Sequence, residues 1–117
     1  MKKSPAIRFT GETQEGLPVF ELLEPLTYDG LVVPVGFKSN GANFPWWYRG
    51  IRDPLHPTIL RAAIVHDYLY SGAIKTSRFK ADCYYYKIAR EDGLPRQIAF
   101  MHFLLLRVFG KSNFAKF

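Results

Sequence analysis

The stretch AAIVHDYLYSG, residues 62–72, carries a histidine beside an aspartate inside an otherwise apolar run. On a helix, His66 and Tyr70 lie on one face, while Asp67 is turned about 100° from His66. Asp82 follows in a second predicted helix, within reach of His66 if the two helices pack antiparallel across the short SGAIK connection. A carboxylate bonded to one ring nitrogen fixes the tautomer and leaves the other nitrogen free to take a proton from water. The pattern therefore predicts a general base, His66, oriented by Asp82, with Asp67 available to a hard cation.

The same residues have a structural interpretation. Burying a histidine and two carboxylates is unfavourable unless their hydrogen bonds and charges are satisfied, but satisfied networks also hold helices together. In this alternative, His66, Asp67 and Asp82 clamp the helix pair and do no chemistry. The exposure of His66 distinguishes the two interpretations, because a general base must reach water and substrate.

Three helices are predicted to position these residues. Apolar residues recur at spacings of three and four after Pro57, and serine, threonine, proline and glycine mark the helix ends. The expected boundaries are as follows: a first helix capped by Thr58 and ended by Ser71–Gly72, a second from Thr76 or Ser77 to Gly93, and a third from Pro95 to Gly110.

Strand signals occupy the first 37 residues. Strands are predicted over residues 6–9, 18–23 and 26–37, the last broken by Asp29–Gly30. Asp-Gly between apolar flanks favours a hairpin, because glycine readily takes the positive φ of a tight primed turn. We therefore expect a small antiparallel meander followed by the helices, which is an α+β fold in a single domain over residues 1–117.

The segment between strands and helices, KSNGANFPWWYRGIRDPL, is rich in glycine, proline, asparagine and tryptophan and is predicted to be an ordered connector. Trp46 and Trp47 have two interpretations. One ring could fill the core while the other covers it, or both could form an interfacial anchor beside Arg49, which would suit an anionic lipid surface. Stacking on nucleic acid is less favoured, because no recognised binding motif accompanies the rings.

The composition bounds the partners and the location. Sixteen Lys and Arg against ten Asp and Glu give a net charge of +6, which favours anionic partners without choosing among them. Cys83 is the only cysteine, so no disulfide can form within the chain. No apolar run approaches the roughly 18 residues of a membrane span, and MKKSPAIRF lacks the apolar block of a signal peptide. We therefore expect neither a transmembrane segment nor a signal peptide.

The segments VHDYLY and RFKADCYYY resemble the HDxxY and D motifs of secreted phospholipases of the A-two type. They are closer still to the HDxxY and ADxxF motifs of the phospholipase domain in parvovirus capsids. The resemblance implies that His66 activates water, that Asp67 binds calcium, that Tyr70 is the helical tyrosine and that Asp82 orients the histidine. The glycine-rich calcium loop of these enzymes, YxGxG, is absent from the chain.

A second resemblance extends over nearly the whole chain. The series VPVGFKSNGANFPWW, RAAIVHDYLYSG, SRFKADCYYYKIAREDGLP and LLRVFG resembles a small family of tailed phages and prophages, domain of unknown function 1353. Its pattern is roughly VPxGFxTDxASxP, AAxxHDxLY, RxxADxxF and VRxxG. Asn40 stands where this pattern has Asp, and Asn43 where it has Ser, which removes a charge and a hydroxyl from a candidate metal site. If the family site uses that Asp for a metal, this chain would bind the metal more weakly or not at all. Alternatively, Asn40 and carbonyl oxygens of FKSNGANFP would complete a calcium site around Asp67 instead.

Two classes of function follow. In the first, a phage-encoded hydrolase similar to phospholipases uses His66, Asp82 and Tyr70 for catalysis, with calcium held by Asp67 and Asn40. In the second, which the whole-chain resemblance favours, the protein is a non-catalytic virion or tail component or a host-interaction factor. Its partner would then be a phage structural protein or a host factor, and it would be located in the host cytoplasm or the virion. The sequence leaves the oligomeric state open.

Overall fold

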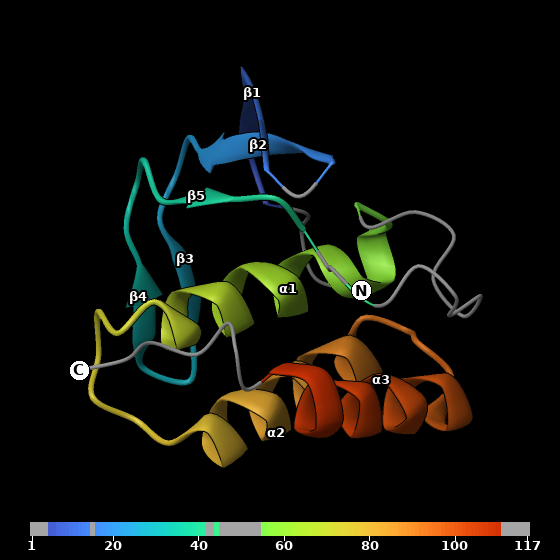
Figure 1. Cartoon of the computed structure of the whole chain (residues 1–117). Coiled ribbons are helices and arrows are strands. Elements are labelled where there is room, and N and C mark those ends of the chain that lie inside the picture. The colour runs from blue at the N-terminus through green and yellow to red at the C-terminus, as the bar shows by residue number, and fades with distance from the viewer. Residues whose placement is uncertain (1–4, 15, 42–43, 45–54, 111–117) are drawn as a thin grey trace.

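The computed structural model describes residues 5–14, 16–41, 44 and 55–110. Within these ranges the chain forms five strands followed by three helices, which confirms the predicted α+β fold. Figure 1 shows the strands gathered at one end of the molecule, with α1 lying between them and the pair formed by α2 and α3. Trp46, Trp47 and Arg49, the predicted surface anchor, lie outside the described residues.

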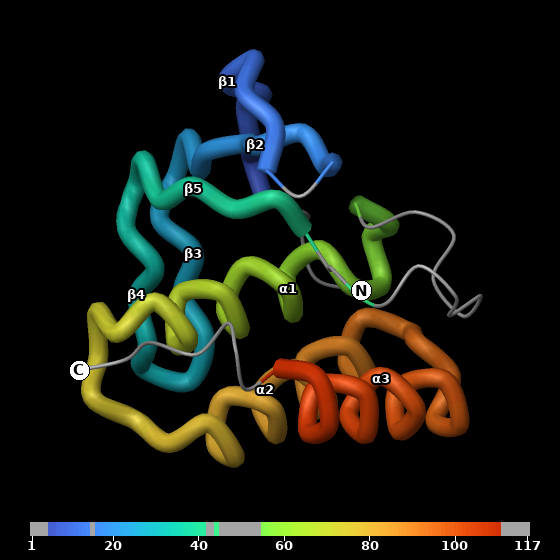
Figure 2. Tube along the Cα trace, in the orientation of Figure 1, coloured from blue at the N-terminus to red at the C-terminus, as the bar shows by residue number. Residues whose placement is uncertain are grey.

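The strands are antiparallel, as expected, but they are divided between two sheets. Strands β1 (Ile7–Gln14), β2 (Leu17–Leu22) and β5 (Lys38–Ser39) form one sheet in the order β1-β2-β5. Strands β3 (Leu26–Tyr28) and β4 (Leu31–Val33) form a separate hairpin. The hairpin lies between β2 and β5 in the sequence, so β5 returns past it to pair with β2, and the tube in Figure 2 shows β5 running alongside α1.

The turn between β3 and β4 is the one that the sequence predicts. Asp29 has a φ of 52° and Gly30 a φ of 80°, so both central residues occupy the left-handed region that a primed turn requires. Glycine takes this conformation without strain, and aspartate is one of the few other residues that tolerates it.

The helices are α1 (Pro57–Tyr70), α2 (Arg78–Glu91) and α3 (Arg96–Phe109). Ser77 caps α2, since its side chain accepts a hydrogen bond from the backbone of Lys80. The predicted cap of α1 was wrong: the residue is His56, whose ring nitrogen accepts from the backbone of Thr58. Pro57 occupies the first helical position, which places the cap one residue before it. In the described ranges, no helix is both long and apolar enough to cross a bilayer.

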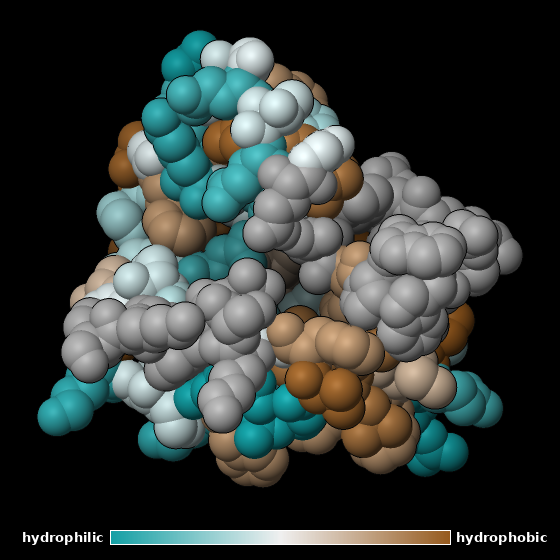
Figure 3. Space-filling view, in the orientation of Figure 1, coloured by the Kyte–Doolittle hydropathy of each residue, from teal (hydrophilic) through white to brown (hydrophobic). Residues whose placement is uncertain are grey.

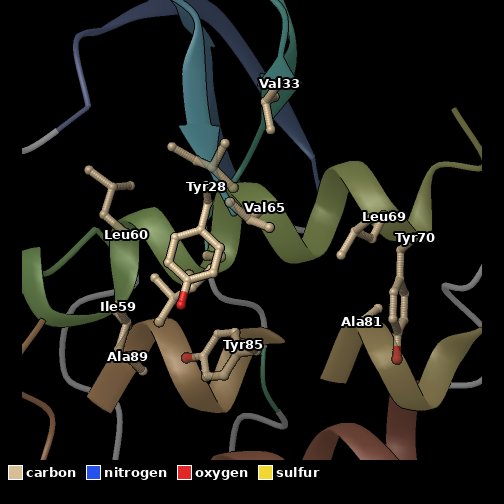
Figure 4. Close-up of a cluster of buried hydrophobic side chains, with 14 of the residues drawn as sticks. Tyr28, Val33, Ile59, Leu60, Val65, Leu69, Tyr70, Ala81, Tyr85 and Ala89 are labelled. Carbon is tan, nitrogen blue, oxygen red and sulfur yellow. The ribbon is translucent and has the colours of Figure 1, made fainter. Parts of the chain in front are cut away.

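The core lies on both sides of α1. One side packs against Phe20 and Leu22 of β2 and Val33 of β4, and the other against Tyr85 and Ile88 of α2, all of them buried. Figure 4 shows Val33 on one side of α1 and Tyr85 and Ala89 on the other. A helix covered on both sides is apolar around most of its circumference, which explains the continuous run from Ala62 to Val65. A polar residue in this helix therefore has to find its partners inside the protein.

Candidate functional site

His66 on α1 and Asp82 on α2 form a buried hydrogen-bonded pair. Nε2 of His66 lies 2.8 Å from Oδ1 of Asp82, and the hydroxyl of Tyr70 donates to the same oxygen over 2.6 Å. The prediction that antiparallel packing of the first two helices brings Asp82 to His66 is thus confirmed. Because an ionised carboxylate can only accept, Nε2 of His66 carries a proton and donates it to Asp82, and Nδ1 is the ring nitrogen that this bond leaves for other partners.

Arg107 on α3 completes the surroundings of Asp82. Its guanidinium donates to Oδ2 of Asp82 over 2.9 Å, and the Asp82 side chain is 0% exposed. Burial alone would raise the pKa of Asp82, but hydrogen bonds from His66, Tyr70 and Arg107 outweigh it and lower this pKa below its ordinary value. Asp82 is therefore ionised at neutral pH, and Arg107 supplies a positive charge beside it.

A pocket of about 290 Å³ opens beside this pair. His66 is only 6% exposed, but it lines this pocket and is not sealed in the core. Since Nε2 is bonded to Asp82, Nδ1 is the ring nitrogen left for a molecule in the pocket. The other lining residues come from β1, from β5 and the residues on either side of it, and from the three helices and the residues that follow α1 and α3: Gln14, Phe37, Lys38, Ser39, Asn40, Gly41, Phe44, Ala63, Asp67, Tyr70, Ser71, Tyr85, Leu105, Leu106, Phe109 and Gly110.

Asp67 and Asn40, the predicted calcium ligands, line the same pocket. The hydroxyl of Ser39 donates to Oδ2 of Asp67, and the backbone of Gly41 donates to the Ser39 hydroxyl over 3.2 Å. The side-chain amide of Asn40 donates to the carbonyl of Gln14 over 3.2 Å. The hydrogen bond between Ser39 and Asp67 thereby joins β5 to α1 at the wall of the pocket.

Asp67 and Asn40 by themselves supply too few oxygen ligands for a calcium ion. Calcium takes six to eight oxygen ligands, usually including several carboxylates. In the described ranges no cluster of three or more His, Cys, Asp or Glu residues could hold a metal. Among the described residues that line the pocket, Asp67 is the single carboxylate, and it already accepts from Ser39. The expectation of a calcium site at Asp67 and Asn40 therefore finds no support in the donor set of the described residues.

Tyr85 lines the pocket and connects it to a second histidine. Its hydroxyl lies 2.9 Å from Nδ1 of His102, and its ring meets that of His66 edge-on. His102 is buried, and its ring packs against that of Phe44 with the ring centroids 4.7 Å apart. Tyr85 and His102 thus support the wall behind His66.

A second buried ion pair lies at the other end of the two helices. Arg61 on α1 forms two hydrogen bonds to Asp92, of 3.0 and 2.9 Å, and a longer one to Glu91. Tyr28 donates to Glu91 over 2.6 Å, and this hydrogen bond lowers the pKa of Glu91. This cluster ties the β3–β4 hairpin to α1 and the end of α2, and none of its residues lines the pocket beside His66.

Sequence reasoning missed four residues of the site: Lys38, Ser39, Tyr85 and Arg107. A signal existed for Arg107, because it is a lone cation inside the apolar run FLLLRVF, where a charge needs a buried partner. Ser39 and Lys38 carried no such signal, since polar residues are ordinary in a segment between strands and helices.

Comparison with known proteins gives one match. Residues 20–105 match the family described as Protein of unknown function (DUF1353). The chain belongs to this family. The matched range begins in β2 and ends in α3, so it contains the DUF1353 segments that carry Ser39, His66, Asp67 and Asp82. No curated protein and no solved structure matches significantly.

Proposed function

We propose that this DUF1353 protein is a hydrolase of carboxylic esters, with His66 as its general base and Asp82 as the residue that orients the imidazole. One observation carries the proposal: His66 is bonded through Nε2 to an ionised carboxylate and at the same time lines a pocket. A purely structural histidine needs the first of these features but not the second.

The reaction would proceed as follows. A water molecule hydrogen-bonded to Nδ1 of His66 attacks the ester carbonyl and gives its proton to that nitrogen as the new C–O bond forms. The tetrahedral intermediate then expels the alkoxide, which takes the proton back from Nδ1, so that an acid and an alcohol leave. Asp82 keeps its negative charge throughout and stabilises the imidazolium, as Arg107 and Tyr70 hold the carboxylate in place.

The walls of the pocket suit an ester with an apolar acyl group. Leu105, Leu106 and Phe109 of α3 supply one apolar side, and Phe44 another. Lys38 is the one lysine or arginine among the described lining residues, and it would stabilise the negative charge that develops on the carbonyl oxygen. An apolar cavity with a few polar groups near a base is the usual form of a site for a small ligand.

The test uses the purified chain with a series of p-nitrophenyl esters of increasing acyl length, and follows nitrophenolate release. The wild type should hydrolyse them in a chain-length-dependent manner, and His66→Gln should lower kcat by about 100-fold or more. Lys87→Gln, an exposed change on α2 outside the pocket, is the matched control and should keep full activity. An inactive wild type, or a folded His66→Gln variant that keeps wild-type kcat, would exclude the hydrolase.

A second candidate is the non-catalytic phage protein, which binds a structural protein of the phage or a host factor. The observation that favours it is that Asp82 joins three helices: it accepts from His66 and Tyr70 on α1 and from Arg107 on α3. Such a clamp stabilises a fold without any chemistry. An inactive wild type whose thermal midpoint falls sharply in His66→Gln would support this role, and capture of a phage component by the tagged chain would identify the partner.

A further inference from the structure

We propose that the outer face of α3 docks onto an anionic lipid bilayer. Large apolar side chains are exposed there as a group, although scattered single ones would be ordinary. We call this surface the α3 face, and it consists of Phe79 at the start of α2 with Phe100, Met101, Leu104 and Val108 of α3. Figure 3 shows brown, apolar surface gathered over α3 on the side that faces the viewer.

The α3 face is continuous. Phe100, Leu104 and Val108 follow one another at four-residue spacing, so they form a line along the helix. The half-buried ring of Phe103 stacks on Phe100 and meets Phe79 edge-on, with ring centroids 6.4 and 6.2 Å apart. This joins the start of α2 to the line on α3.

Packing inside the protein does not account for these side chains. The inward face of α3 already buries Ala99, His102 and Leu106 against the other helices. Val108 is nevertheless 68% exposed and Phe100 52% exposed. A helix that is apolar on its outer as well as its inner side has a second surface to cover, which a one-sided amphipathic helix lacks.

The charges around the α3 face favour anionic lipid over a second copy of the chain. Residues 94–110, which contain α3, carry two arginines and no Asp or Glu, and the whole chain has a net charge of +6. Arg96 begins α3, and Arg107 lies over the ring of Phe79, 5.3 Å from its centre. An apolar helix face flanked by cations is the usual composition of a helix that lies in a membrane interface. Two copies docked through this face would bring their arginines close to one another. Because each chain has a net charge of +6, the two copies would repel each other.

The α3 face also continues toward the pocket. Phe109 follows Val108, is half exposed, and lines the pocket beside His66. A bilayer docked on the α3 face would therefore lie next to the pocket. Docking does not depend on the proposed ester hydrolysis, but it would bring lipid esters to that site if the hydrolase proposal holds.

The experiment measures sedimentation of the full chain with vesicles of phosphatidylcholine and phosphatidylglycerol in equal parts, and with phosphatidylcholine alone. The wild type should bind the mixed vesicles more strongly, and added salt should weaken this binding because it screens the arginines. The double substitution Leu104→Gln with Val108→Gln should lower the partition coefficient about tenfold or more. Arg96→Gln should lower it several-fold on the mixed vesicles only.

The matched control is the double substitution Val32→Gln with Val35→Gln, which removes two equally exposed apolar side chains at β4 and just after it. It should bind vesicles like the wild type. His66→Gln should also bind vesicles like the wild type. Failure of the hydrolase proposal and failure of the docking proposal therefore give different results. The proposal is overturned by a wild type that ignores anionic vesicles, or by an α3-face variant that binds as well as the wild type. If the wild type does not bind vesicles but forms a dimer, and the double substitution Leu104→Gln with Val108→Gln dissociates that dimer, the α3 face is a surface for self-association instead.

Discussion

Nη1 of Arg107 lies 2.9 Å from Oδ2 of Asp82, so a charge on the third helix is paired with a fully buried carboxylate on the second. The other oxygen of Asp82 is taken by His66 and Tyr70. The hydrogen bond that orients the His66 ring therefore depends on the Asp82 carboxylate, which belongs to α2 and also accepts from Tyr70 of α1 and Arg107 of α3. Stability and the proposed chemistry meet in this one side chain.

Arg107→Gln is expected to destabilise the protein by about 1–3 kcal/mol, because it removes a charged hydrogen bond and leaves Asp82 buried with less compensation. Urea unfolding followed by circular dichroism measures the change. Arg96→Gln is the control on the same helix, and as an exposed change it should stay within about 0.5 kcal/mol of the wild type. Equal stability of the two variants would contradict the assignment of Arg107 to the Asp82 cluster.

The contribution of Asp82 to stability is expected to depend on pH. Its pKa in the folded protein lies below the ordinary value of 3.8, so its stabilising effect is fully present above that value and is lost as the pH falls through the lower folded pKa. The difference in unfolding free energy between the wild type and Asp82→Asn should therefore be largest near neutral pH and shrink below about pH 4. Denaturant titrations at several pH values measure it, and NMR of the carboxyl carbon of Asp82 gives the pKa directly. A difference that grows in acid would contradict the prediction.

Gly110→Ala is expected to disturb the site through Tyr70. A β-carbon at Gly110 would lie 2.7 Å from the Tyr70 hydroxyl, which is the group that donates to Asp82. Since Tyr70 is buried, the clash should lower stability by about 1–3 kcal/mol. Tyr70→Phe removes the hydroxyl, so the double variant should be less destabilised than the sum of the single ones, and a thermodynamic cycle of the four proteins measures this coupling. Strict additivity would mean that Gly110 does not act on Tyr70.

Arg61→Met should destabilise the fold by about 3–5 kcal/mol, because it leaves Asp92 buried without its cation. Arg61 lies outside the pocket, so the folded fraction of this variant should keep the wild-type kcat on esters. Lys87→Met removes an exposed cation over the same Tyr28 ring and serves as the control, with a much smaller loss of stability. A comparable loss in both variants would argue that burial of the Arg61–Asp92 pair is unimportant.

The helices and the β3–β4 hairpin were accessible from the sequence, because their signals act over a few residues. Helical periodicity, the Ser77 cap and the Asp29–Gly30 turn each depend on near neighbours. The contact of His66 with Asp82 was accessible for the same reason, since a short connection forces neighbouring helices to pack antiparallel.

Long-range partners were not accessible. Arg107 reaches Asp82 from 25 positions away, and Ser39 lies 28 positions from Asp67. Such pairs depend on how the elements dock and not on local pattern. Strand β1 was also longer than predicted, because the polar residues up to Gln14 resemble a loop in sequence yet pair with β2 at an exposed edge, after an irregularity in the register between Phe9 and Thr13.

The hydrogen bond between Ser39 and Asp67 connects two parts of the chain that contribute differently to the pocket. The pair of His66 and Asp82 is held by the helices alone, whereas part of the pocket wall comes from β5 and the residues beside it. Substitutions in that wall can alter which molecules are admitted without touching the hydrogen bonds of His66. Under the proposed function, residues 38–41 would therefore set which ligands the pocket accepts, while the helices that hold His66 stay unchanged.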